Sequence, residues 1–234
     1  MRLTKKDLFP LTVIGSVQFI ILTLVAMVTY KGGTRLDPTS KGYSFFSNFF
    51  SDLGRTVSYS GEANTVSAVI FFVALIGLGL SFLGYFLIIP ELFTETDEGI
   101  KYSNIVSFIG KCSVVAFIGV AFAPADILPF IHDMLVITGF TLIAIVSGST
   151  FILLAKYSRF TRKSRAVFLF LFVVVLSYGS LSLFIPAIIT QTHLIIRVTA
   201  QKIVIYTLIL SFLFQSYDAW KIIRNKEEID VESK

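Results

Sequence analysis

The sequence predicts an all-α integral membrane protein in which six transmembrane helices form a bundle. Three observations support this fold class: a high apolar content, the grouping of apolar residues in long blocks, and basic residues beside those blocks. Of the 234 residues, 55% are hydrophobic, and the mean hydropathy is +0.81. A soluble domain of this length has no interior large enough for so much apolar surface.

Six apolar blocks are long enough to cross a bilayer, because a membrane-spanning helix needs about 20 mostly apolar residues. We expect helices over residues 10–30, 64–89, 102–123, 133–155, 166–189 and 194–217. Pro90 and Pro124 mark two of the ends, since the residue before a proline avoids helical conformation. The basic start of the chain is similar to a secretory signal, but the first apolar run is longer than such segments, which favours a retained helix.

Basic residues in the short loops predict the orientation of the bundle. They are Arg2, Lys5 and Lys6 before the first block, Lys156, Arg159, Arg162, Lys163 and Arg165 after the fourth, and Lys221, Arg224 and Lys226 after the sixth. With six spans these groups share one side, and Lys and Arg near helix ends favour the cytoplasm. We therefore expect a plasma or cell membrane protein with both termini cytoplasmic: a membrane domain over residues 1–220, a charged tail over 221–234 and a long extracytoplasmic first loop.

Aromatic residues surround a small polar cluster in the first predicted loop. The run is Phe49-Phe50-Ser51-Asp52-Leu53-Gly54-Arg55. One interpretation is that this segment enters the membrane interface and holds Ser51 and Asp52 near membrane depth for a functional role. The other is that Ser51 or Asp52 caps a short helix, since both side chains accept hydrogen bonds from free backbone N–H groups.

The loop between the third and fourth predicted helices carries a second polar cluster. Asp126, His132 and Asp133 lie in a largely apolar hairpin stiffened by two prolines. His132 has the only imidazole near these acids, and histidine titrates near neutral pH. Asp126 is equally well explained as a turn residue, and Asp133 as an acid favoured at the positive end of the fourth helix.

The sixth predicted helix has a polar stripe. His193, Arg197 and Gln201 are four residues apart, so they share one face, and Lys202 lies beside Gln201. A Lys near the middle of a span costs about 2.5–3.5 kcal/mol on insertion scales, so it usually faces the bundle interior with a partner. We expect Asp52 or Asp126 to pair with Arg197 or Lys202.

These charges have two interpretations. They line a polar cavity that opens to the outside, which we favour, or they form buried ion pairs that only fix the packing of the helices. Lys111, near the middle of the third helix, either reaches the inner surface or lines the same cavity from below. Both possibilities stay open from the sequence.

Several chemistries find little support in the residues. With two histidines and one cysteine, we expect no metal site, and we expect no other cofactor because no phosphate-binding glycine loop is present. A serine hydrolase built on Ser51 and His132 lacks a Gly-x-Ser-x-Gly elbow. The formal net charge of +5 does not indicate nucleic acid, because the basic residues cluster beside apolar blocks, where they suit lipid head groups.

We therefore expect membrane lipids as partners, with an anionic head group in the outer cavity. The ligand-binding candidates are Ser51, Arg55, His193, Arg197, Gln201 and Lys202, because basic side chains bind phosphate and carboxylate. If a reaction occurs, Asp52, Asp126 and His132 are the acid–base candidates. Whether the protein is an enzyme stays open, as do its protein partners. The alternatives are a non-enzymatic scaffold or lipid-organisation factor, and a small transporter.

The layout of six helices with Ser51-Asp52-Leu53-Gly54 after the first helix resembles the membrane family catalogued as domain of unknown function 998. The hairpin with Asp126 and His132 is similar to the second polar cluster of that family. More distantly, the chain is similar to the DRAM-like superfamily of autophagy modulators and GPI-anchor-remodelling proteins. Those relatives carry Ser-Asp-Thr-Gly at this place, so Leu53 departs from their pattern. The resemblance implies a lipid-linked role and points to Ser51, Asp52 and Gly54 as important residues.

Overall fold

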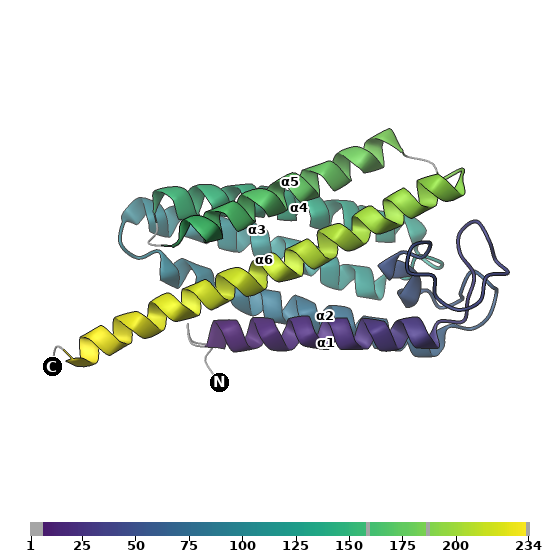
Figure 1. Ribbon diagram of the computed structural model, residues 1–234, viewed down its shortest axis with the longest axis horizontal. Coiled ribbons are helices and arrows are strands. Elements are labelled where there is room, and N and C mark those ends of the chain that lie inside the picture. Colours follow the sequence, from purple (N-terminus) through teal and green to yellow (C-terminus); the bar gives the residue numbers. More distant parts are fainter. Residues whose placement is uncertain (1–6, 158–159, 186–187, 233–234) are drawn as a thin grey trace.

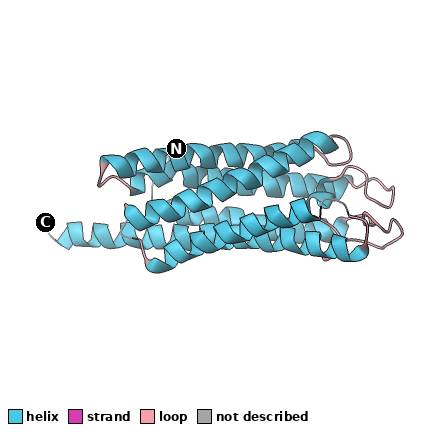
Figure 2. Ribbon diagram, turned by 90° about the horizontal axis from the view of Figure 1, so that it is seen from above, coloured by secondary structure: helices cyan, strands magenta, loops and turns pink. Residues whose placement is uncertain are grey.

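The computed structural model of the protein describes residues 7–157, 160–185 and 188–232, and these residues form a bundle of six α-helices (Figure 1). The helices are α1 (Leu8–Thr29), α2 (Thr65–Ile88), α3 (Asp97–Phe122), α4 (Pro129–Lys156), α5 (Arg162–Phe184) and α6 (Gln191–Glu232). Two short 3-10 helices, η2 (Phe50–Gly54) and η3 (Ile89–Leu92), lie between them. The described residues form no β-strand, and Figure 2 shows helices joined by loops.

The six predicted spans are confirmed as helices, and the differences lie at their ends. The fourth helix begins earlier than predicted, at Pro129, because proline is tolerated in the first turn, where its missing N–H is not needed. The fifth ends earlier, at Phe184, and the cause is in the sequence: Pro186 disfavours helix at the residue before it. The sixth continues well beyond residue 217 and through most of the predicted tail to Glu232.

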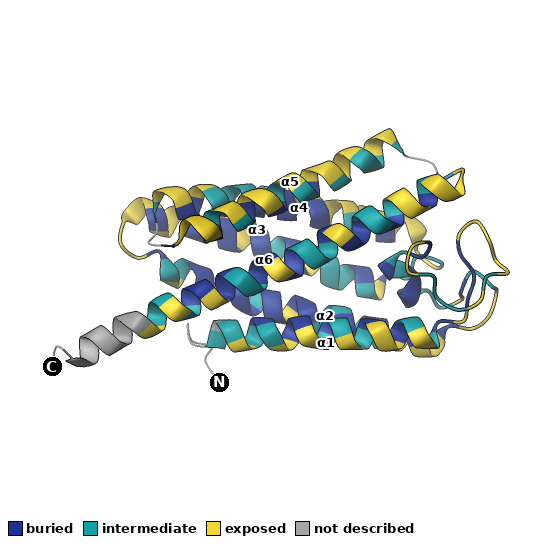
Figure 3. Cartoon of the chain, viewed as in Figure 1, coloured by how far each residue is buried: buried dark blue, intermediate teal, exposed yellow. Residues whose placement is uncertain are grey.

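All six helices contain a segment of 21 to 34 residues that is long and apolar enough to cross a membrane. Many large apolar side chains on their outer surfaces are exposed, among them Val28, Phe108 and Leu183. In Figure 3 exposed positions recur along α1, α5 and α6. Lipid, rather than water, is the solvent that such surfaces fit. The chain is therefore a multipass membrane protein.

The helices pack in chain order around the bundle, and α6 closes it by packing against both α5 and α1. An aromatic layer fills the centre. Phe212 of α6 stacks on Phe82 of α2 with ring centroids 4.6 Å apart, and it also contacts the rings of Tyr85, Phe86 and Phe168. Edge-to-face and stacked pairs of this kind stabilise a core beyond their buried area. This layer holds α2, α5 and α6 together.

The two ends of the bundle differ. The first loop, residues 31–64, gathers at the end where α6 begins, while α1 begins and α6 ends at the opposite end (Figure 1). We call the first of these the capped end; the basic residues predict that it is extracytoplasmic. Four residues used in that prediction, Arg2, Lys5, Lys6 and Arg159, lie outside the described residues.

Candidate functional site

The first loop is folded by its own backbone turns. Gly33 has a positive φ of +80°, a conformation that favours glycine, and a Cβ there would lie 2.4 Å from the backbone nitrogen of Ser60. Its N–H donates to the carbonyl of Ser40 at 2.8 Å. Asn64, buried just before α2, donates from its side chain to the carbonyls of Leu53 and Arg55. These contacts close residues 31–64 into a compact cap.

Asp52 folds the short helix η2 at the centre of this cap. Its carboxylate accepts a hydrogen bond from the backbone N–H of Phe49 at 2.8 Å, and Asp52 itself is 3% exposed. Asp52 lies at the third position of η2 and Phe49 at the N-cap position, so Asp52 orders the start of the helix from within it, whereas the sequence alternative made Ser51 or Asp52 the capping residue. Burial raises the pKa of Asp52, while the hydrogen bonds from Phe49 and Asn48 and the positive charges of Arg55 and Lys202 act in the opposite direction.

Asn48 is the centre of the hydrogen-bond network in the cap. Its side chain is fully buried, donates to the carbonyl of Gly33 at 3.0 Å and to the carboxylate of Asp52 at 3.3 Å, and accepts from the N–H of Ser44 at 2.9 Å. Its main-chain carbonyl accepts from the hydroxyl of Tyr43 at 3.0 Å. Every polar group of this side chain is therefore used to hold the loop.

Lys202 of α6 enters the cap from below. Its side chain is 2% exposed, and its ammonium donates to the main-chain carbonyl of Asn48 at 2.6 Å. The ammonium also lies 4.9 Å from the ring centroid of Phe45 and 5.4 Å from that of Phe50. Cations are attracted to aromatic faces at such distances. A carbonyl and aromatic rings, rather than a carboxylate, thus surround this buried charge.

We predicted that Asp52 or Asp126 pairs with Arg197 or Lys202, and the contact that the structure gives the ammonium of Lys202 is with the main-chain carbonyl of Asn48. Asn48 lies between Lys202 and Asp52: its carbonyl accepts from the lysine, and its side chain donates to the carboxylate. The sequence argument considered only charged partners for a buried lysine. A backbone carbonyl is a sufficient acceptor, and no residue type in the sequence reports where such a carbonyl lies.

Gln201 and Gln191 fasten the same cap to α6. The side-chain oxygen of Gln201 accepts from the backbone N–H of Phe50 at 2.9 Å, a contact 151 residues apart in sequence. At the start of α6, Gln191 donates to the hydroxyl of Ser47 at 3.0 Å. Gln201 is buried and is therefore a partner of the loop, not the wall of an open cavity.

Asp126 joins the cap to the loop between α3 and α4. Its carboxylate accepts from the backbone N–H and the hydroxyl of Thr56, at 3.0 and 2.5 Å, and from the N–H of Val57 at 2.8 Å. Partial burial alone would raise the pKa of Asp126, but these hydrogen bonds outweigh it and hold the pKa below the ordinary value. Asp126 therefore connects the first loop to the loop between α3 and α4.

His132 joins two helix ends. Its ring is buried, and Nδ1 lies 2.7 Å from the main-chain carbonyl of Ala123. Because a carbonyl only accepts, Nδ1 carries the proton. His132 thus ties the first turn of α4 to the end of α3, while Asp126 binds Thr56 and Val57. No described hydrogen bond joins these two side chains, which we expected to lie in one cluster.

The remaining candidates lie around the edge of the cap. The guanidinium of Arg55 lies over the ring of Tyr59, 4.0 Å from its centroid, and its Nε donates to the carbonyl of Val57. Ser51 is half-buried. On α6, Arg197 and His193 are half-buried, and the Nδ1 atom of His193 is buried without a hydrogen-bond partner among the described residues. The two α6 residues lie one and two turns above Gln201.

Two candidates stand apart from this arrangement. Lys111 is half-buried on α3, and Asp133 is exposed on the first turn of α4. Within the described ranges, no group of three or more His, Cys, Asp or Glu side chains is placed to hold a metal ion. The polar residues that meet at the capped end are therefore those of the first loop and α6.

Sequence reasoning missed Asn48, Asn64 and Tyr43, which organise the cap. The signal that was present is weak: two asparagines and a tyrosine in a glycine-containing loop are common in any turn. Their importance comes from the burial of Asn48 and Asn64 next to main-chain carbonyls 15 and 11 residues away in the same loop. Nothing in the local sequence reports that burial.

Comparison with known proteins adds no relative to this description. No protein-family model matches the chain, and neither does any curated protein or solved structure. The activity of the capped end must therefore be argued from its own residues.

Proposed function

We propose that the protein binds the anionic group of a membrane lipid or lipid-linked molecule at the capped end. The observation that carries the proposal is the environment of Lys202. Its ammonium is buried, and the one hydrogen bond that it makes with the described residues goes to a neutral carbonyl. A buried cation with unused donors attracts an anion, because an unpaired charge in a low-dielectric interior is costly.

The residues around Lys202 at the edge of the cap support the approach of a lipid head group from the membrane side. His193 and Arg197 lie two turns and one turn outward from Gln201 on its face of α6, and Lys202 lies about 100° round the helix from Gln201. Phe45 and Phe46 are 39% and 55% exposed beside this face and fit among lipid tails. A head group would meet Arg197 first, and movement of residues 43–50 would let it reach the ammonium of Lys202. Arginine and lysine are the usual partners of phosphate and carboxylate.

We propose binding without a chemical step. The three acid–base candidates already have defined contacts: Asp52 caps η2, Asp126 holds Thr56 and Val57, and His132 donates to Ala123. Each contact orders a loop or a helix end. The alternative, a non-enzymatic scaffold in which Lys202 only anchors the loop, is favoured by the complete hydrogen bonding of Asn48.

Replacing Lys202 separates the two functions. In Lys202→Met the carbonyl of Asn48 keeps its hydrogen bond from Tyr43, so we expect a folded protein with an unchanged or higher Tm. If Lys202 binds an anion, the affinity for added phosphatidylglycerol, measured by native mass spectrometry, falls roughly tenfold to a hundredfold.

Lys111→Met is the matched control, because it removes a half-buried lysine from another helix. It should leave the affinity unchanged. Wild-type affinity in Lys202→Met contradicts the proposal. A lower Tm and faster proteolysis of the first loop, without a change in lipid binding, support the scaffold instead.

A further inference from the structure

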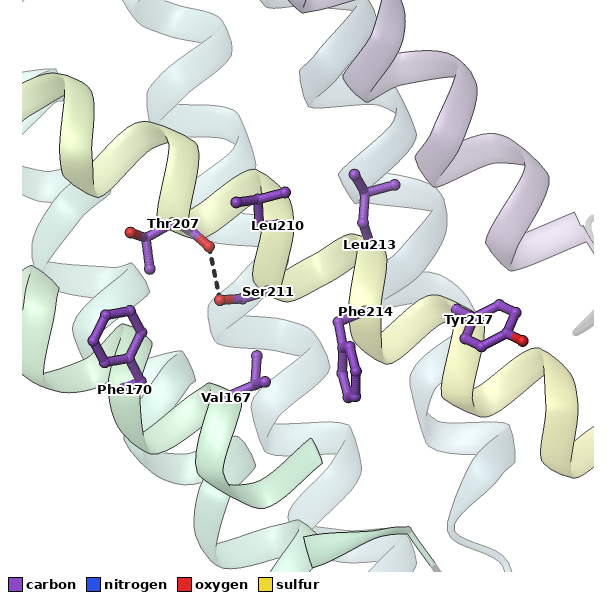
Figure 4. Close-up of a pocket in the computed structure, with 8 residues that line it drawn as sticks. All are labelled: Val167, Phe170, Thr207, Leu210, Ser211, Leu213, Phe214 and Tyr217. Carbon is purple, nitrogen blue, oxygen red and sulfur yellow. Dashed lines mark hydrogen bonds between the residues drawn. The ribbon is translucent and has the colours of Figure 1, made fainter. Parts of the chain in front are cut away.

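An apolar groove lies between α5 and α6, in the half of the bundle away from the cap (Figure 4). Its volume is about 520 Å³, within the range of roughly 300–1,000 Å³ that ligand sites occupy. Val167 and Phe170 line it from α5, and Leu210, Phe214 and Tyr217 line it from α6. It is open on one side and faces the surface where the bundle meets lipid.

The lining is mostly apolar, and the hydroxyl of Ser211 already has a hydrogen-bond acceptor. The hydroxyl of Ser211 donates to the main-chain carbonyl of Thr207 at 2.7 Å, as the dashed line in Figure 4 shows. The lining therefore offers methyl, methylene and ring surfaces. An apolar chain is the occupant that such a lining accepts without loss of hydrogen bonds.

Hydrogen bonds fix the end of the groove. At the start of α5, the hydroxyls of Thr161 and Ser164 both donate to the carboxylate of Asp218 on α6. This contact places the first turn of α5 beside the turn of α6 that carries Tyr217. The buried carboxylate of Asp218 is thus stabilised by two hydroxyl donors of the same protein.

Two exposed lysines continue the groove past this end. Lys163 lies four residues before Val167 and seven before Phe170, so these three side chains share one face of α5. On α6, Lys221 follows Tyr217 by four residues and shares its face. Lys163 and Lys221 form what we call the basic rim. A negatively charged group bound at the basic rim lies next to the apolar groove. An anion that carries an apolar chain can contact both, whereas a free anion contacts the rim alone.

We propose that this groove binds an anionic phospholipid, with an acyl chain along Phe170 and Leu210 and the phosphate at Lys163 and Lys221. Charge complementarity and the apolar lining together select this occupant. Tyr217 lies where lipid tails meet head groups, a position that aromatic residues with a polar tip favour. The site is separate from the capped end and does not depend on the function proposed there.

Trp220, the only tryptophan of the chain, lies next to this site, because it contacts the groove residue Tyr217. Its ring stacks on Tyr217 with a centroid distance of 6.1 Å. In vesicles of phosphatidylcholine, we would titrate phosphatidylglycerol with brominated acyl chains and measure quenching of Trp220 fluorescence. Brominated phosphatidylcholine is the reference lipid. We expect half-maximal quenching at a mole fraction roughly tenfold to thirtyfold lower for phosphatidylglycerol, because each basic residue adds to the attraction.

The double variant Lys163→Gln/Lys221→Gln should lose this preference and remain folded, since both residues are exposed. The control variant Arg162→Gln/Lys156→Gln removes the same number of positive charges from exposed positions outside the groove face. It should retain the preference for phosphatidylglycerol. Lys202→Met should retain the preference for phosphatidylglycerol as well, which separates this site from the capped end.

Equal quenching by both lipids in wild type, or unchanged preference in the Lys163→Gln/Lys221→Gln variant, overturns the proposal. So does disulfide-linked dimer formation by Leu210→Cys in a Cys112→Ser background, which would make a second copy the occupant.

Discussion

A single asparagine holds more of the capped end together than any charged residue. Asn48 connects the turn at Gly33, the carboxylate of Asp52 and the ammonium of Lys202. A buried amide with all its groups bonded gives a unique arrangement, because each partner that is lost leaves another polar group unsatisfied.

We therefore expect Asn48→Ala to lower the free energy of unfolding by about 1–3 kcal/mol, the usual cost of buried groups left without partners. The measurement is the Tm of the purified protein together with the rate of proteolysis in the first loop. Asn104→Ala removes an exposed asparagine that donates only to the carbonyl of Ile100, so it should change neither. Equal effects of the two variants would show that the Asn48 network contributes nothing.

Gly54 tests how closely the cap lies on the bundle. A Cβ at this position would approach a ring carbon of Phe71 on α2 to 2.7 Å. Gly54→Ala should lower stability by about 1–3 kcal/mol, the usual cost of overpacking. At Gly179 on α5 nothing lies within 4 Å of an added Cβ, so Gly179→Ala should leave the Tm unchanged or slightly higher. A Tm loss for Gly179→Ala as large as that for Gly54→Ala would contradict this account.

At the scale of elements, the cap is joined separately to each part of the bundle that it touches. Gln201 and Lys202 bind it to α6, Ser67 of α2 donates to the carbonyl of Leu53, and Asp126 binds it to the loop after α3. Because the contacts come from three different elements, the cap stays closed only when the helices are correctly placed.

The contact at Asp126 depends on pH. The pKa of Asp126 is lowered from its ordinary value of 3.8 in the folded protein. Its contribution to stability is therefore present above about pH 4 and is lost as the pH falls through the lowered pKa. The pKa of Asp52 is raised, so its contribution has the opposite sign: it falls as the pH rises above 3.8.

Comparison of wild type with Asp126→Asn isolates the pH-dependent contribution of Asp126 to stability. Between pH 5 and pH 3 (about one unit on either side of the ordinary value), proteolysis near Thr56 should accelerate in wild type. In Asp126→Asn it should be faster at pH 5 and should not accelerate further on acidification, because the amide does not titrate in this range. Parallel pH profiles for the two proteins would rule out Asp126 as the group responsible.

At the scale of the whole molecule, an aromatic layer separates two polar regions of α6. Lys202 lies at the capped end and the buried Gln215 lies toward the other, with Phe212 and its partner rings on α2 and α5 between them. A transporter needs a polar path through the bundle. The packing of Phe212 gives that alternative no support.

The orientation of the bundle is also a property of the whole molecule, and basic loops predict it. In a Cys112→Ser background, Thr39→Cys places a thiol at an exposed position of the cap, and Lys163→Cys places one at an exposed position of the opposite end. An impermeant maleimide applied to intact cells should label Thr39→Cys and should label Lys163→Cys only after permeabilisation. The reverse pattern would place the cap in the cytoplasm.

The sequence by itself determined the fold class and the number of spans, because bilayer thickness requires long apolar blocks, and such blocks are visible along the chain. Helix ends followed less closely: Pro129 starts a helix that we expected to begin at Asp133, and α6 runs on to Glu232. The sequence also pointed to Asp52, Gln201 and Lys202, because polar groups inside apolar segments need partners.

Only the tertiary structure decided what those partners are. Lys202 meets the carbonyl of Asn48, Gln201 meets the N–H of Phe50, and Asp126 meets Thr56. All three contacts include main-chain groups, which every residue carries, so their position depends on how a long loop folds back and not on residue type. Local patterns report which groups must be satisfied, whereas contacts across 151 residues of chain arise only when the whole bundle has formed.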